Sequence, residues 1–169
     1  MGVGAWGGSG AVGPGATRVV CGRGLASGLV GGSQGGDYPP AVRARPALTE
    51  PKFDVRGSSR EIDDRVKDVL QNAISVYRVD ETLLNDLAPD MIVTQAQCEV
   101  CAVSLSEVER VARECLSTPA QIVSLEPMQV ADVLADILRV AQALGVPERG
   151  AELTLRLQLR MDDIAKRSG

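Results

Sequence analysis

Cys98 and Cys101 are the residues of this sequence whose type and spacing best suit chemistry. The two residues between them allow a disulfide, and a helix that begins shortly afterwards would stabilise a thiolate, so a thiol-disulfide protein is one hypothesis. A structural zinc site needs four ligands, but the chain has no histidine, and Cys21 and Cys115 form no second close pair, so we expect no metal site. Two further interpretations are that the pair packs as small hydrophobes or that it lines a ligand cleft.

Polar side chains accompany the two cysteines. Gln95, Gln97 and Glu99 could bind the amides or hydroxyls of a large ligand, although solvated loop residues would look the same. Glu126 follows a later apolar run, where it could face a cleft or cap the next helix. Because the chain lacks histidine, the usual general base near neutral pH is missing, and no catalytic constellation emerges. We therefore expect a protein that is not an enzyme.

The loop that carries these residues follows a short buried strand. Pro89 ends the preceding helix, and Met91, Ile92 and Val93 form the continuous apolar run of a parallel strand that is covered on both faces. Residues 94–104 then lie at the carboxyl end of this strand, which is where open α/β sheets hold their ligands.

Helices and strands alternate along the rest of the chain, as a parallel sheet requires. Ser58 and Glu61 form the pattern of a capping box, Pro127 suits the first turn of a helix, and Gly145 can end that helix in the left-handed conformation. The expected elements are helices over residues 58–73 and 81–87, a helix from 104, an extended segment at 75–77, a strand over 120–125 and a helix over 127–144.

Three charged residues of this last helix are expected to lie in solvent. Asp132, Asp136 and Arg139 are three or four positions apart, so they share one face of the helix. Such spacing is typical of a solvated surface with ion pairs.

Residues 147–167 fit both a strand and a helix by periodicity, and their composition favours the helix. Leu155 and Leu159 then fall outside the main apolar stripe of that helix. We expect these two leucines to be exposed or to bind another chain.

Composition limits the partners and the compartment. The net charge of −4 and the pI near 4.9 argue against nucleic acid, and no apolar run approaches the roughly 18 residues of a membrane span. Residues 1–36 hold 14 of the 18 glycines, so we expect residues 1–15 to be disordered. Because this segment lacks the apolar core of a secretory signal, we expect a cytoplasmic or organellar protein rather than a secreted one.

Three stretches of the chain resemble one protein family. They read GGDYPPAVRARP, LAPDMIVTQAQCEVCAVS and AQIVSLEPMQVADVLADILRVAQALG. These stretches are similar to the cobalamin- and iron-chelate-type substrate-binding proteins of ABC importers, whose cobalamin-binding-like branch carries a comparable TQ-x-x-CEVCAVS loop. The resemblance runs from Thr17 to Lys166. It implies an α/β fold with a small parallel sheet flanked by helices, followed by the long helix that joins two lobes.

The resemblance also implies a domain organisation and a site. Residues 16–146 would form the first lobe with its first strand missing, residues 147–167 would form the interdomain helix, and the second lobe would be absent. Asp37 and Tyr38 are retained from a loop that normally reads S-H-E-C-D-Y-P. The implied ligand-binding residues are Asp37, Tyr38, Gln95, Gln97, Cys98, Glu99, Cys101 and Glu126.

We therefore predict half of a solute-binding protein that needs no cofactor and whose ligand is a corrinoid or an iron chelate, bound weakly or not at all by this chain alone. One alternative is an interaction module that associates with itself or with a partner through Leu155 and Leu159. The other is a thiol-disulfide protein that uses Cys98 and Cys101.

Overall fold

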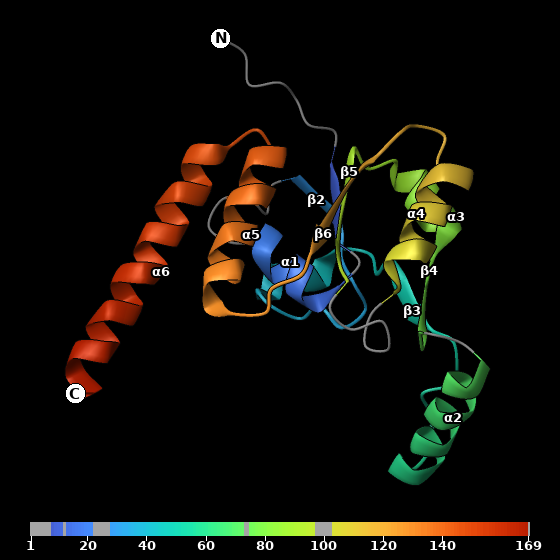
Figure 1. Cartoon of the computed structure of the whole chain (residues 1–169). Coiled ribbons are helices and arrows are strands. Elements are labelled where there is room, and N and C mark those ends of the chain that lie inside the picture. The colour runs from blue at the N-terminus through green and yellow to red at the C-terminus, as the bar shows by residue number, and fades with distance from the viewer. Residues whose placement is uncertain (1–7, 12, 22–27, 73–74, 97–102, 169) are drawn as a thin grey trace.

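A computed structural model describes residues 8–11, 13–21, 28–72, 75–96 and 103–168 of the chain. Strands and helices alternate along these residues, as expected (Figure 1). The elements are β1 Ser9–Ala11, α1 Pro14–Val20, β2 Leu29–Gly31, the 3-10 helix η2 Pro40–Ala44, β3 Thr49–Pro51, α2 Ser59–Asn72, β4 Tyr77–Val79, α3 Glu81–Leu87, β5 Met91–Gln95, α4 Leu105–Glu114, β6 Gln121–Leu125, α5 Val130–Ala143 and α6 Pro147–Ser168.

The main sheet has four parallel strands in the order β2-β1-β5-β6, and β3 and β4 form a separate antiparallel pair. Ser9 of β1 pairs with Met91 of β5, which in turn pairs with Gln121 of β6. The α/β class predicted from the sequence is thus confirmed. Because all four strands run the same way, their carboxyl ends meet at one edge of the sheet.

The sheet is covered on both faces. Met91 and Val93 of β5 pack with α1 and α5, whereas Ile92 between them packs with α3 and α4 on the other face. This alternation is the period of a strand, and burial of both faces explains the continuous apolar run in the sequence. In Figure 1, α1, α5 and α6 lie on one side of the sheet and α3, α4, β3 and β4 on the other.

The expectation that the first strand is missing is wrong. Ser9–Ala11 forms β1, which lies between β2 and β5 and is therefore an interior strand of the sheet. Its small residues suit close packing, because a Cβ on Gly10 would lie only 3.0 Å from Cδ1 of Leu48. Glycine weakens a strand by itself, but backbone pairing on both sides outweighs that cost here. The predicted disorder of residues 1–15 is wrong where β1 and the start of α1 form, and its other positions, 1–7 and 12, lie outside the described residues.

Three helices have a capping hydrogen bond at their start, and the one at Ser58 and Glu61 was predicted. The Ser58 backbone N–H donates to Glu61, and the Asp80 and Ser104 side chains accept from the first turns of α3 and α4. The predicted start of α5 was wrong, because the helix begins at Val130 rather than at Pro127. Its end agrees with the prediction, since Gly145 has the left-handed φ of 67°.

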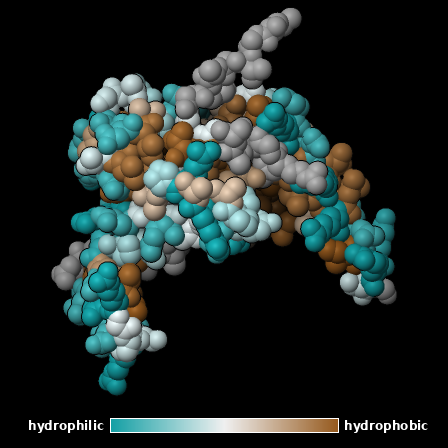
Figure 2. Space-filling model, turned by 180° about the vertical axis from the view of Figure 1, so that it is seen from behind, coloured by the Kyte–Doolittle hydropathy of each residue, from teal (hydrophilic) through white to brown (hydrophobic). Residues whose placement is uncertain are grey.

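Two helices protrude from the body of the molecule, α6 at one side and α2 at the other (Figure 1; Figure 2). The first half of α6 packs on α5, where Gly150 approaches so closely that a Cβ would lie 2.5 Å from Cβ of Ala141. Leu155 and Leu159 are 62% and 60% exposed, as predicted. No helix in the described ranges is long and apolar enough to cross a membrane.

Candidate functional site

The carboxyl edge of the sheet is the candidate site. Strands β1, β2, β5 and β6 all end there, and the edge faces downward in Figure 1, between α2 and the free end of α6. The residues that follow these strands provide its polar groups, because parallel strands release their chains into loops at this edge.

Gln95 is the last residue of β5 and lies against the first turn of α1. A Cβ on Gly15 would come within 2.7 Å of Oε1 of Gln95, so the glycine leaves room for the amide. Thr17 fixes this turn of α1, since its hydroxyl donates to the carbonyl of Gly13 at 3.0 Å. The structure therefore places Gln95 at the predicted edge, half-buried beside the first turn of α1.

Asp37 and Tyr38 lie in the loop that follows β2 and contact α1 through Arg18. The Arg18 guanidinium is 3.7 Å from the Asp37 carboxylate and 5.9 Å from the centre of the Tyr38 ring. The Tyr38–Pro39 peptide bond is cis. Tyr38 remains 63% exposed, so its ring presents an open face beside the edge.

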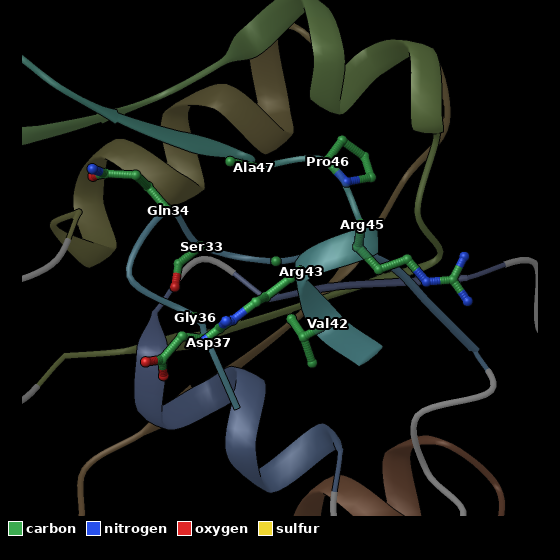
Figure 3. A pocket seen from close by; sticks show the side chains of 10 residues that line it. Ser33, Gln34, Gly36, Asp37, Val42, Arg43, Arg45, Pro46 and Ala47 are labelled. Atoms are coloured by element: carbon green, nitrogen blue, oxygen red, sulfur yellow. The ribbon is translucent and has the colours of Figure 1, made fainter. Parts of the chain in front are cut away.

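Ser33 is a site residue that the sequence analysis did not select. It lines a cavity of about 330 Å³ together with Asp37, Val42 and Arg43. Figure 3 shows Ser33, Asp37 and Arg43 near one another at this cavity. The Ser33 side chain is buried, yet its Oγ has no hydrogen-bond partner among the described residues. A buried hydroxyl without a partner is costly, and a ligand or water that bonded to it would remove that cost.

Thr94 on β5 is a second buried residue whose hydroxyl has no hydrogen-bond partner among the described residues. It is fully buried. The only signal for either residue in the sequence is a small polar side chain at the end of an apolar strand.

Glu126 lies exposed just after β6, and its Oε1 accepts from the Ser124 hydroxyl at 3.4 Å. It does not cap the next helix, because the Asp132 carboxylate accepts the N–H groups of Met128 and Gln129 instead. The capping interpretation of Glu126 is therefore wrong, and its carboxylate stands free of that role at the sheet edge.

Asp136 corrects the expectation of a fully solvated face. Its side chain is only 4% exposed, and one carboxylate oxygen lies 3.2 Å from Arg139 while the other has no partner among the described residues. Burial raises the pKa of Asp136, an effect that nearby Arg139 opposes, and Asp132 and Glu126 raise it further.

Four predicted ligand-binding residues lie outside the described residues, namely Gln97, Cys98, Glu99 and Cys101. Their roles, including the redox pair, remain predictions. Burial raises the pKa of Cys21, and a hydrogen bond to Glu81 together with burial raises the pKa of Cys115, so both environments favour the thiol over the thiolate. Within the described residues, no cluster of three or more histidine, cysteine, aspartate or glutamate side chains could hold a metal ion.

The chain thus combines a parallel sheet covered on both faces, polar groups at its carboxyl edge and a long helix that leaves the layer. Solved structures share this fold. The periplasmic vitamin B12 binding protein BtuF of Vibrio cholerae matches with a TM-score of 0.64 and 15% identity over 94% of this chain and 49% of that chain. A periplasmic heme binding protein from Pseudomonas aeruginosa matches with a TM-score of 0.64 and 16% identity, over 95% of this chain and 46% of that one.

The periplasmic heme-binding protein RhuT from Roseiflexus sp. RS-1 is similar as well, with a TM-score of 0.62 and 19% identity over 95% of this chain and 50% of that chain. No protein-family model matches the sequence, and no curated protein matches it. At these identities the likeness shows the fold, and the chain spans about half the length of these solved proteins. The α/β fold with a long last helix, which the sequence resemblance implies, is thereby confirmed.

The predicted compartment is wrong. We expected a cytoplasmic or organellar protein, but the solved proteins that share the fold are periplasmic. The prediction of the compartment relied on the lack of a secretory-signal-like apolar core near residue 1. That observation carries no information about the fold.

Proposed function

We propose that this chain forms one wall of the binding site of a two-lobed solute-binding protein whose ligand is a corrinoid or an iron chelate. The observation that carries the proposal is the polar carboxyl edge of the sheet. There Gln95 presents an amide, Glu126 a carboxylate and Ser33 a buried hydroxyl without a partner among the described residues. The solved proteins of this fold, which bind vitamin B12 or heme, support the ligand class.

Between these two ligands the polar groups favour the corrinoid. A corrinoid carries several amide side chains around its ring, and amide, hydroxyl and carboxylate groups can all hydrogen-bond to amides. Heme iron is usually held by a histidine, cysteine, methionine or tyrosine ligand, and this chain has no histidine. Tyr38 is an exposed tyrosine beside the edge and could serve as a heme ligand, so the experiment also includes a titration with heme.

The second wall of the site would come from another lobe, carried by the free end of α6. Leu155 and Leu159 are exposed on that helix and would contact the other lobe. If the complete site binds with a dissociation constant of about 1 μM, half of its contacts supply about half of the free energy, which corresponds to about 1 mM. An extracytoplasmic location fits this role.

Calorimetric titration of the purified chain with cyanocobalamin and with heme tests the proposal. We expect cyanocobalamin to bind with a dissociation constant near 1 mM and Gln95→Ala to weaken it about fivefold, since the amide contributes about one hydrogen bond. Gln142→Ala is the matched control, because Gln142 is exposed on α5 at the opposite edge. A dissociation constant below about 10 μM would contradict the half-site argument, and equal effects of the two variants would contradict the assignment of Gln95.

A further inference from the structure

A second cavity lies between α1, the cis-proline turn and α6, and it shares Tyr38 with the candidate site. It encloses about 680 Å³, within the range of small-molecule sites. Helix α6 contributes one stripe of side chains, because residues three, four and seven positions apart share a helix face. The stripe consists of Leu153, Arg156, Leu157 and Arg160, and the facing residues are Arg18, Cys21, Tyr38 and Pro39.

The cavity is strongly basic although the chain as a whole carries a net charge of −4. Arg156 and Arg160 are one helical turn apart, so their like charges repel, and neither forms an ion pair with a carboxylate in the described residues. Arg18 has Asp37 as a partner, but at 3.7 Å with both side chains 64% exposed, so that pair is weak. Three guanidinium groups thus face one carboxylate, leaving two positive charges uncompensated.

Apolar surface lies next to these charges. Leu153 is buried and Leu157 half-buried, and the exposed ring of Tyr38 forms the facing wall. Such a lining binds an apolar or aromatic body, while planar guanidinium groups bind carboxylate or phosphate oxygens in pairs. A neutral ligand would leave the arginine repulsion in place.

We propose that this cavity binds a small molecule that carries a doubly negative group on an apolar body. The assignment goes beyond the solute-binding role, because it depends on the arginines of α1 and α6 rather than on Ser33, Gln95 and Glu126. Carboxylates and phosphates share the required charge and geometry, so both kinds of ligand are tested.

The test compares three probes with the same aromatic body, namely naphthyl phosphate, naphthalene dicarboxylate and naphthol. Their binding to the full chain is followed by calorimetry at low and at physiological salt. We expect at least one dianion to bind about tenfold more tightly than naphthol, with an advantage that shrinks as salt screens the guanidinium groups. If only one dianion binds tightly, its oxygen chemistry identifies the ligand class.

Arg156→Gln together with Arg160→Gln should weaken the tighter dianion about tenfold and leave naphthol within about twofold. Arg60→Gln with Arg113→Gln is the matched control, because it removes the same charge from exposed positions on α2 and α4. Equal binding of all three probes, or equal losses in the two double variants, would overturn the proposal. Neither result changes the outcome of the corrinoid titration, so the two proposals can fail separately. The comparison of the three probes uses the unchanged chain and therefore remains valid even if a variant does not fold.

Discussion

Asp136 shows how one buried charge should govern the response to pH. Burial raises its pKa above the ordinary value of 3.8, so the folded state holds this proton more tightly than the unfolded state does. The stability that the proton provides is complete below the ordinary pKa and is lost as pH rises through the raised one. At neutral pH the ionised group therefore destabilises the fold, despite its contact with Arg139.

We predict that Asp136→Asn raises the free energy of unfolding at neutral pH by about 1 kcal/mol, because it removes the buried charge. The gain should shrink as pH falls toward the ordinary pKa of aspartate. Urea unfolding at several pH values measures it, with the exposed Asp64→Asn of α2 as the control. A variant that is less stable than the wild type at neutral pH would show that the ion pair with Arg139 outweighs burial.

For single residues, the sequence predicted which side chains lie at the sheet edge better than it predicted which side chains are buried. Gln95 and Glu126 were selected because they follow apolar runs, and both lie at the sheet edge. Asp136 and Ser33 were not recognised as buried residues. The spacing of residues along a helix or a loop is the same whether a side chain is buried or exposed, so spacing cannot reveal burial. Burial depends on what packs above a residue, and that is decided by distant segments.

Among the elements, the helices were the most predictable. The capping pattern at Ser58 and Glu61 and the composition of α6 are local signals, and the structure reproduces both helices. Strand β1 has no such signal, because Ser9, Gly10 and Ala11 have little preference for a strand. Pairing with β2 and β5 fixes it, and those partners lie far along the chain.

The place of β1 inside the sheet predicts that this segment is essential for folding. Ala11 is fully buried, so Ala11→Asp should cost about 3 kcal/mol or more by placing a charge in the core. The same exchange at Ala44, which is exposed in η2, should change stability by less than about 0.5 kcal/mol. Thermal unfolding followed by circular dichroism compares the two, and equal melting temperatures would mean that β1 does not form.

Helix α6 carries the second prediction at this scale. Leu155 and Leu159 remain uncovered when the chain is alone, so they should promote self-association at high concentration. Leu155→Glu with Leu159→Glu should make the chain more monomeric without lowering its melting temperature, as light scattering and calorimetry would show.

Ala135→Glu with Ala151→Glu adds the same two charges at exposed positions and serves as the control for this variant. If the unmodified chain stays monomeric at high concentration, the exposed leucines do not drive association.

The whole molecule combines a polar sheet edge with two protruding helices, one on each side of that edge (Figure 1). Its fold covers 49% of the solved vitamin B12 binding protein and 46% of the heme binding protein from Pseudomonas aeruginosa. The resemblance in the sequence predicted this architecture, because the loop after β5 and the helices around it form a continuous pattern. The ligand could not be predicted in the same way, since it depends on a few side chains at the edge.

The most direct test is a map of backbone amide shifts by nuclear magnetic resonance as cyanocobalamin is added to the chain. Amides at the carboxyl edge should shift, those of Ser33, Gln95 and Glu126 among them, while Asp90 and Val146 at the opposite edge should not. The shifts should still be rising at millimolar ligand, as half a site requires. Shifts centred on the opposite edge, or none at the highest soluble concentration, would contradict the assignment of this chain as one wall of a solute-binding site.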